Sequence, residues 1–333
     1  MDDDLDALTS KLSEGFQVDP TALGEHPRYS QFKNLTKTAQ QQAKRRQEAL
    51  ERQKNGRFEK LMKLRNLAYD DITSDDDEEV SAKAEDAENV AAIFGDAEQR
   101  RHRGKYADQL MLSEWLVDIP ESLSTEWTMV MAPQGKRTLV VASRGFTTSY
   151  NKAGRQMSQF QSRLPGGSSK GKGGHSWTIL DCICNNHVYY VLDLLSWNGH
   201  EYHENPFDFR QFMLQSKLEE SPELAVSTTG FRNVFVGLPK CACSREAMEE
   251  LMQTKITWRL DGLLFYHNSV IYEPGQSALV GWLKPWMLPE ILNVPVPEKY
   301  DKESKGQTSA QYIENFNRKH HHTSQIDKSM EQD

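Results

Sequence analysis

Apolar residues are distributed unevenly along the chain and divide it into three zones. Up to about residue 103 the sequence has almost no β-branched or aromatic runs, and no stretch resembles a buried strand. From residue 104 to 299, apolar and aromatic runs alternate with turn residues, and after residue 300 the sequence is polar and aperiodic again. The pattern predicts one folded domain at 104–299 and a disordered tail at 300–333.

The folded zone is predicted to be a mixed domain built mainly of strands. Runs rich in Val, Ile, Tyr and Phe and bounded by turn residues occur at 125–133, 136–143, 177–184, 187–195 and 262–272. Helices are expected at 110–119, 207–218 and 244–253. Ser244 is a suitable N-cap for the last of them. The expected fold class is therefore α+β, and a zone of roughly 190 residues can bury a substantial core.

Composition narrows the class of protein further. Only 37% of the residues are hydrophobic and 26% are charged, which indicates that part of the chain is not packed. No apolar run approaches the roughly 20 residues that cross a bilayer, and the N-terminus is acidic where a secretory signal is basic and then apolar. The four cysteines indicate a reducing compartment, cytosol or nucleus. We interpret Cys182 and Cys184, which lie within one predicted strand, as buried thiols rather than zinc ligands.

Charge is arranged in blocks before the folded zone. Between Arg28 and Arg65 there are twelve Lys or Arg residues and three acids, and an acidic segment at 68–103 follows. Block-charged sequence of this kind is usually disordered in isolation. From Ala39 the composition favours a helix, but its apolar stripe is too thin to stabilise it without an acidic partner surface. A nucleic-acid-binding arm or a solvated face is the alternative.

The basic segment 26–67 contains RYSQFKNLTK, KRR and ERQK at 28–37, 44–46 and 51–54. It resembles the importin-beta-binding segment of importin alpha and of snurportins. An importin alpha would continue into helical repeats, whereas this chain continues into predicted strands, which leaves the snurportins. The resemblance implies that importin beta is bound through Arg28, Phe32, Lys33, Asn34, Lys44, Arg45 and Arg46.

The N-terminal residues 1–25 carry a short apolar pattern among acidic and polar residues. It consists of Leu5, Leu8, Leu12, Phe16 and Val18. The spacing gives one face of a short helix with an extended end, a pattern that docks in hydrophobic grooves. Packing on the protein's own domain is the alternative. The pattern resembles the leucine-rich export signal through which snurportins bind a nuclear exportin with Ran.

Four short motifs in the folded zone resemble, in order, those of mRNA capping enzymes and DNA ligases. They are MAPQGKR (131–137), TILDCI (178–183), DGLLFY (261–266) and GWLKP (281–285). In these nucleotidyltransferases a lysine attacks the α-phosphate, carboxylates bind Mg²⁺ and further lysines neutralise phosphate charge. The resemblance implies a nucleotidyltransferase-like domain.

The residues that carry this chemistry are missing. Ala132 occupies the nucleophile position and Gln134 that of an aspartate, while Ile183 replaces a glutamate. Trp282 stands where the enzymes have a lysine, although Lys284 is retained. We therefore expect a nucleotide-shaped pocket without catalysis, metal or cofactor. An active nucleotidyltransferase using another lysine remains one alternative, and a general RNA-binding protein using the basic arm is a second.

Further stretches resemble snurportins, among them DQLMLSEW (108–115), YNKAG (150–154) and LPGG (164–167). Snurportins bind the 2,2,7-trimethylguanosine (m3G) cap of spliceosomal U snRNAs, so the resemblance implies that ligand. Methylation at N7 makes the guanine cationic, and stacking on an aromatic ring contributes about 1–3 kcal/mol per base. We assign Trp282 as the stacking platform.

The other cap-binding assignments follow from the family's cap-contacting positions. Trp115 would form the apolar wall against the N2 methyl groups, with a place in the core as its alternative. Ser113 and Lys152 would contact the base edge. Lys136, Arg137 and Thr138 would reach the triphosphate bridge, although Lys136 and Arg137 could also form an ordinary turn. The hypothesis is an adapter that carries m3G-capped snRNPs to importin beta and shuttles between nucleus and cytoplasm.

Overall fold

The computed structural model describes residues 35–70, 106–168 and 176–318, and for residues 35–40 and 59–70 it describes the backbone alone. The predictions made for the N-terminal apolar pattern and for the front of the basic segment lie outside these residues. The same is true of nearly all of the acidic segment and of residues 319–333.

A five-stranded sheet holds the segments at which the first and last enzyme-like motifs occur. Its strands, in spatial order, are β1 (Met111–Trp115), β12 (Gly275–Leu283), β11 (Leu260–His267), β2 (Trp127–Pro133) and β10 (Lys240–Ala242). The pair β1 and β12 is parallel and the other pairs are antiparallel. This order places strands from both ends of the domain side by side.

A seven-stranded sheet forms the second layer. Its strands, in spatial order, are β5 (Gln156–Phe160), β4 (Phe146–Tyr150), β3 (Lys136–Ser143), β6 (Trp177–Asn185), β7 (Val188–Trp197) and β8 (His200–Glu201), with β9 (Val234–Gly237) paired to β7. The main core joins the two sheets, because Val130 and Leu264 of the first pack in one buried cluster with Leu139 and Ile179 of the second. The five strands expected from the sequence are confirmed, with shifts of a few residues at their ends.

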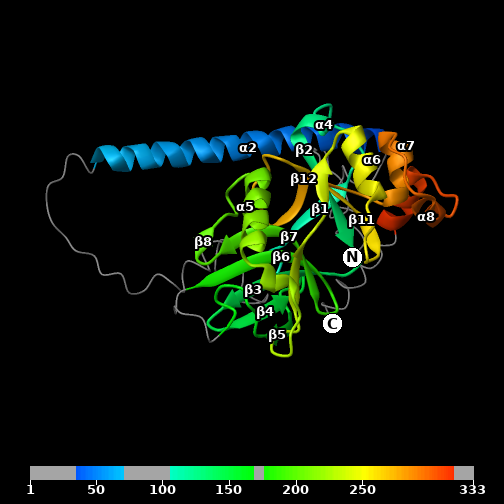
Figure 1. Ribbon diagram of the computed structural model, residues 1–333. Coiled ribbons are helices and arrows are strands. Elements are labelled where there is room, and N and C mark those ends of the chain that lie inside the picture. Colours follow the sequence, from blue (N-terminus) through cyan, green and yellow to red (C-terminus); the bar gives the residue numbers. More distant parts are fainter. Residues whose placement is uncertain (1–34, 71–105, 169–175, 319–333) are drawn as a thin grey trace, which may run out of the picture.

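Short helices cover the outer faces of the sheets (Figure 1). They are α4 (Leu123–Glu126), α5 (Phe207–Glu220), α6 (Arg245–Gln253), α7 (Leu288–Leu292) and α8 (Glu298–Asp301), with 3₁₀ turns at Pro222–Ala225, Pro285–Met287 and Lys302–Ser304. The helices α5 and α6 confirm two predictions. Ser244 caps α6 as expected, since its Oγ accepts a hydrogen bond of 3.3 Å from the backbone N–H of Ala247.

The helix predicted at 110–119 is wrong, because this segment contains the strand β1 instead. Apolar spacing in LMLSEWLVDI suits a helix, but pairing with β12 and burial of Met111 and Leu116 in two different core clusters outweigh it. The backbone N–H of Met111 also donates to the hydroxyl of Tyr272 over 3.1 Å. A strand is stable here because distant residues complete its hydrogen bonds.

The predicted disordered tail is wrong for residues 300–318, which pack on the domain. Residues 309–318 are helical, and Tyr300 and Ile313 are buried in the cluster that α6 and α7 cover. Ser309 fastens the segment, since its N–H and Oγ both donate to Glu290 Oε2, over 2.8 and 2.6 Å. The predicted domain boundary at 299 is therefore too early. The polar composition of this segment outweighed its few apolar residues in the prediction.

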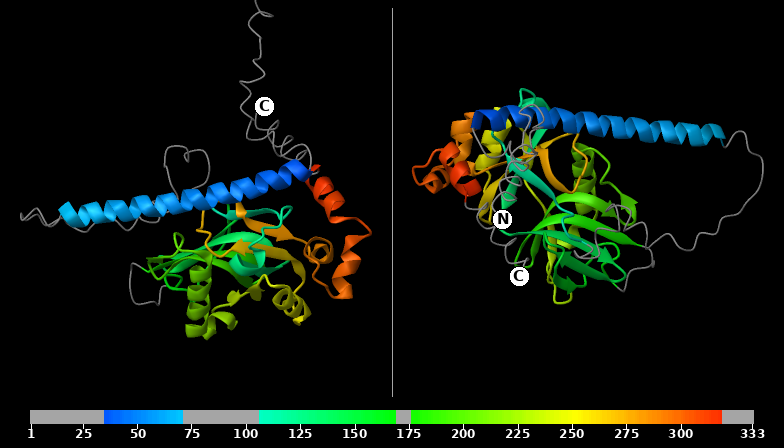
Figure 2. Two further views of the ribbon diagram at one scale, coloured as in Figure 1. Left: turned by 90° about the horizontal axis from the view of Figure 1, so that it is seen from above. Right: turned by 180° about the vertical axis from the view of Figure 1, so that it is seen from behind.

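The basic segment forms a long helix, α2 (Leu35–Asp70), that lies across one side of the domain and extends beyond it (Figures 1 and 2). The helical composition from Ala39 onward is confirmed. Gly56 does not break the helix, and no other group approaches it within 4 Å. None of the described helices, α2 included, is both long enough and apolar enough to cross a bilayer.

Candidate functional site

Trp115 and Trp282 lie beside each other although 166 residues separate them in the sequence. They are register partners on the parallel strands β1 and β12, and both are half-buried. Neighbouring strands in a sheet are about 4.8 Å apart, so the two indoles originate from adjacent points of the backbone. The sheet thus brings the backbones of the two tryptophans together, while Trp282 packs against the core between the two sheets and Trp115 against the cluster that α6 and α7 cover.

The indole of Trp282 packs against the backbone of Gly262 on β11. A Cβ atom placed on Gly262 would come within 2.1 Å of the ring atom Cζ2 and 2.3 Å of Cη2. Any side chain at this position would therefore displace the indole. The Asp-Gly pair resembles an enzyme motif, and here its glycine provides the space that a large aromatic side chain requires.

Lys284, the lysine that remains from the last enzyme-like motif, is held by Asp261. Its Nζ donates to the backbone oxygen and to Oδ1 of Asp261, both over 2.8 Å, and lies 5.5 Å from the centre of the Trp282 ring. A polar cavity of about 380 Å³ lies beside this pair and is also lined by Gln134 and Arg259. The ammonium group is therefore engaged by the protein itself, close to the proposed stacking platform.

Trp115 is supported by the C-terminal segment that the sequence did not predict to fold. The Tyr312 and Phe316 rings contact it edge-on, with centroid distances of 6.0 and 5.2 Å. Tyr312 also contacts the buried Trp286 at 5.5 Å. Edge-to-face pairs of this kind fix the orientation of a ring. The spacing of Tyr312 and Phe316, four residues apart, is that of one helix face and is the signal in the sequence that could have predicted this segment.

Arg137 binds a buried carboxylate within the domain. Its Nε and Nη2 donate to Asp181 Oδ1 and Oδ2 over 2.5 and 2.7 Å, and Nη2 also donates to the carbonyl of Met111. Burial alone would lower the pKa of Arg137. The Asp181 carboxylate outweighs this effect, so the pKa of Arg137 is raised above its ordinary value. Tyr272 completes the group by donating its hydroxyl to Asp181 over 2.7 Å. Arg137 therefore neutralises the buried carboxylate of Asp181 inside the domain.

The prediction that Thr138 reaches a triphosphate is also not supported by the geometry. Thr138 is fully buried, and its Oγ1 donates to the carbonyl of Lys136 over 2.8 Å. Lys136 itself begins strand β3 and is exposed. Because side chains alternate along a strand, a single run of adjacent residues cannot all face one ligand. Of the three residues assigned to the triphosphate, Lys136 is exposed, Arg137 is half-buried and Thr138 is buried.

Ser113 and Lys152 lie on two segments of the chain that meet near the start of β1. Ser113 lies on β1 two residues before Trp115 and pairs with Ser277 of β12. Lys152 is exposed in the turn after β4, and its carbonyl accepts a hydrogen bond of 2.9 Å from the backbone of Asp108. Gly154 allows this approach, since a Cβ there would come 2.4 Å from Ala107 N. The turn is thus joined to the segment that leads into β1.

The positions that would carry catalysis lie in unreactive surroundings. Ala132 is fully buried in β2, opposite Gly262. Asp181 and Asp193 pair across β6 and β7, and Asp193 is bound by the buried Arg210 through two bonds of 2.8 and 2.7 Å. Among the residues that the structure describes, no group of three His, Cys, Asp or Glu side chains could hold a metal ion.

The cysteines are free thiols in apolar surroundings. Cys182 and Cys243 are buried, while Cys184 and Cys241 are half-buried. Burial raises the pKa of Cys182 well above its ordinary value and that of Cys241 to about 11. The interpretation as a buried thiol is confirmed for Cys182, whereas Cys184 of the same pair is half-buried.

Two protein-family models match parts of this chain. Residues 109–285 match the family model for the Snurportin1 m3G cap-binding domain, and residues 26–66 match the model for Snurportin1. Among solved structures, the ligase domain of M. tuberculosis LigD is 14% identical over 52% of this chain, with a TM-score of 0.33, and the chain spans 58% of that domain. A Chlorella virus DNA ligase-adenylate is 12% identical over 53% of this chain and 67% of its own length, also with a TM-score of 0.33.

The class of protein is a cap-binding domain of α+β fold, as expected from the sequence. The chain belongs to the snurportin family. It is a nuclear import adapter that binds the m3G cap of spliceosomal snRNPs and also binds importin beta.

Proposed function

We propose that the m3G cap binds between the side chains that extend from the ends of β1 and β12. The pairing of Trp115 with Trp282 on adjacent parallel strands carries this proposal. Trp282, with one part of its indole on Gly262, stacks its open surface on the cationic base. Trp115, held by Tyr312 and Phe316, forms the apolar wall that contacts the N2 methyl groups.

Polar groups around the tryptophans complete the cap site in this proposal. Ser113 and Lys152 contact the base edge, since the turn that follows β4 is bonded to Asp108 in the segment that leads into β1. Lys136 contacts the triphosphate bridge as an exposed point charge. Arg137 and Thr138 act indirectly by fixing strand β3, to which Lys136 belongs.

The chain acts as an adapter without catalysis in this proposal. Nucleotidyl transfer requires an amine that attacks phosphorus, and Ala132 has none. Lys284 is the lysine retained from the last motif, and its ammonium group donates two hydrogen bonds to Asp261. Incubation with radiolabelled GTP and Mg²⁺ should therefore leave the protein unlabelled. A covalent nucleotide adduct would contradict this part of the proposal.

Transport is assigned to the segment that precedes the domain. Importin beta binds Lys44, Arg45 and Arg46 on α2, together with four assigned residues that precede this helix in the sequence. These earlier residues, Arg28, Phe32, Lys33 and Asn34, lie outside the described part of the chain. An exportin with Ran binds Leu5, Leu8, Leu12, Phe16 and Val18 and returns the empty adapter, so that the protein shuttles between nucleus and cytoplasm.

A fluorescence titration tests the cap site directly. The full chain is titrated with trimethylated and monomethylated cap dinucleotides, and quenching of tryptophan emission reports binding. We expect tighter binding of the trimethyl cap, and loss of most affinity for both caps in Trp282→Ala. Trp115→Ala should reduce the preference between caps more than the affinity for the monomethyl cap. Equal affinities in the wild-type protein, or undiminished binding by Trp282→Ala, would contradict the assignment.

A further inference from the structure

The helix α2 is held on the domain by the basic side chains that are assigned to importin beta. Arg45 forms an ion pair with Glu114, and Arg46 forms one with Asp118. Arg46 also donates from Nη1 to the backbone carbonyl of Asp118 over 2.9 Å. The two acceptor side chains belong to one short segment, residues 114–118, which contains the end of β1. We call this segment the β1 edge.

A glutamine completes the contact between α2 and the backbone of the β1 edge. The amide Nε2 of Gln42 donates to the carbonyl of Trp115 over 2.8 Å. Its Oε1 accepts from the N–H groups of Val117 and Asp118 over 3.2 and 3.0 Å. Both ends of one amide group are therefore used, and Gln42 is only 2% exposed. A buried side chain with all these bonds indicates a specific fit.

The guanidinium of Arg46 is enclosed rather than resting on the surface. Arg46 is 6% exposed, and its guanidinium lies 5.9 Å from the centre of the Trp127 ring. Burial lowers the pKa of Arg46 to about 10, which is still far above physiological pH, so the charge is retained. A second protein cannot bind this guanidinium while Asp118 and Trp127 surround it.

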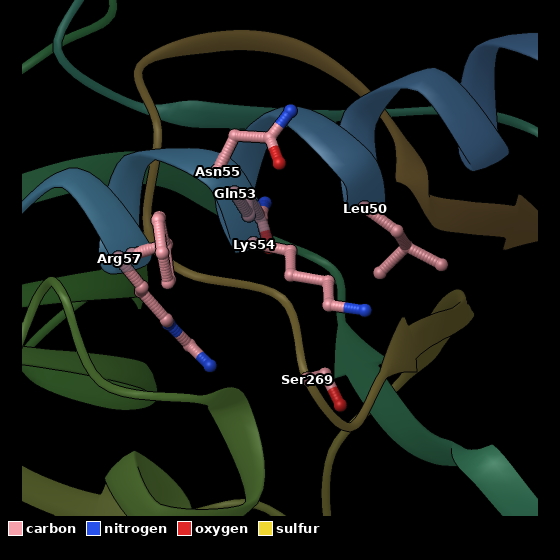
Figure 3. A pocket seen from close by; sticks show the side chains of 7 residues that line it. Leu50, Gln53, Lys54, Asn55, Arg57 and Ser269 are labelled. Atoms are coloured by element: carbon pink, nitrogen blue, oxygen red, sulfur yellow. The ribbon is translucent and has the colours of Figure 1, made fainter.

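The contact is weaker farther along the helix. Arg52 pairs with Glu273 over 3.0 Å, but both side chains are largely exposed. Beyond this point a cavity of about 530 Å³ separates α2 from the loop of Ser269, with Lys54 and Arg57 along its rim (Figure 3). Exposed ion pairs contribute little stability. The polar contacts that hold α2 are therefore concentrated at residues 42–46, while Ala49 and Leu50 add apolar packing against the main core.

We propose that the β1 edge is an autoinhibitory binding surface that competes in cis with importin beta for Arg45 and Arg46. The proposal rests on the assignment of these two arginines to importin beta. A docked arm removes the guanidinium groups from solution, so only the undocked fraction of molecules can bind importin beta. The apparent affinity is then lower than the intrinsic one by this fraction. The β1 edge competes effectively with importin beta because it belongs to the same chain as the arm, so its effective concentration near the arm is high.

The β1 edge also contains Trp115, the proposed wall of the cap site. The arm is bonded to the backbone carbonyl of Trp115 and to the side chain of the preceding Glu114. Docking of the arm and binding of the cap therefore involve the same short segment. An effect of arm docking on cap affinity would be transmitted through this strand.

Titration of full-length variants with importin beta tests the proposal. The double substitution Glu114→Gln and Asp118→Asn removes the charge of the docking surface without altering the arm. We expect importin beta to bind this variant about 3- to 10-fold more tightly, because the docked population falls. Gln42→Ala, which acts from the arm side and is not among the assigned residues, should have the same direction of effect. Glu273→Gln is the matched control and should leave the affinity unchanged.

Amide hydrogen exchange of the same full-length proteins provides a direct measurement of docking. Residues 41–58 should exchange slowly in the wild-type protein and in Glu273→Gln, and faster in both the double variant and Gln42→Ala. Unchanged importin beta affinity in both of these variants would overturn the proposal. A double substitution of Arg45 and Arg46 by Ala should weaken importin beta binding. Failure of that result alone would instead contradict the assignment of the arginines.

Discussion

Gly262 lies so close to Trp282 that one methyl group between them would collide with the indole at 2.1 Å. We predict that Gly262→Ala lowers m3G-cap affinity by about 10-fold or more, because a misplaced stacking platform loses about 1–3 kcal/mol. Fluorescence titration with the trimethyl cap dinucleotide measures the effect. Gly230→Ala is the control, since no group lies within 4 Å of that position. Wild-type affinity in Gly262→Ala would show that Trp282 does not stack on the base.

Lys136 and Arg137 are neighbours in sequence but should respond differently to substitution. Lys136→Ala should weaken binding of the cap dinucleotide about 5- to 10-fold while leaving binding of the trimethylated nucleoside unchanged, because only the former carries a triphosphate. The loss should be smaller at high salt, since exposed charges are screened. Titrations with both ligands at two salt concentrations provide the measurement. Equal losses for the two ligands would place Lys136 at the base instead.

Arg137→Ala should act on stability. Removal of the guanidinium leaves Asp181 buried without its partner, and breaking a buried pair in this way costs about 3–5 kcal/mol. The free energy of unfolding, measured with urea near neutral pH, should fall by this amount, whereas Lys136→Ala should change it by less than about 0.5 kcal/mol. Normal stability in Arg137→Ala would mean that Tyr272 alone can compensate Asp181.

Ile313 tests whether the C-terminal segment is part of the domain. Its side chain is 5% exposed in the cluster beneath α6 and α7. We predict that Ile313→Ala lowers the free energy of unfolding by about 2–4 kcal/mol through lost burial and a cavity. The neighbouring Glu314→Ala changes a side chain that is 72% exposed and should have little effect. Chemical denaturation of both variants measures the effect. Equal free energies of unfolding for the two variants would show that this segment does not pack as part of the domain.

His267 should make stability depend on pH. Burial lowers its pKa, opposed by Glu126, and its Nδ1 accepts a hydrogen bond of 3.1 Å from the N–H of Ser269. Protonation would break this bond, so the unfolded chain binds the proton more strongly than the folded one. Stability is then complete above the ordinary pKa of about 6.5 and is lost as the pH falls below it. Between pH 7 and 5.5, the free energy of unfolding should decrease less in His267→Asn than in the wild-type protein. The same pH dependence in both proteins would contradict this prediction.

The elements that could be predicted from the sequence are those whose pattern is local. The five main strands and the helices α5 and α6 were predicted because apolar periodicity and the cap at Ser244 are visible in short windows. Strand β1 was mistaken for a helix because its spacing suits both structures, and only pairing with β12 decides between them. The folded segment at 309–318 escaped prediction because its contacts are with side chains far away in the sequence.

The candidate site shows the same division. Trp115, Trp282 and Lys136 were chosen from motifs, and the structure places the first two on paired strands. The sequence could not predict which of the assigned side chains bind other groups of the protein itself. Arg137 is bound by a carboxylate 44 residues later in the chain, and Lys284 by one 23 residues earlier. Such partners depend on strand register, which a motif does not contain.

By itself, the sequence determined the α+β class and the separation of a basic arm from a cap-binding domain. These properties depend on which residue types are present and on their local order. Tertiary structure alone decided that Gly262 accommodates Trp282, that Arg137 serves the core, and that Arg45 and Arg46 bind the β1 edge. Each of these facts joins residues between 20 and about 70 positions apart, and the free energy of such contacts depends on geometry that only the folded chain creates.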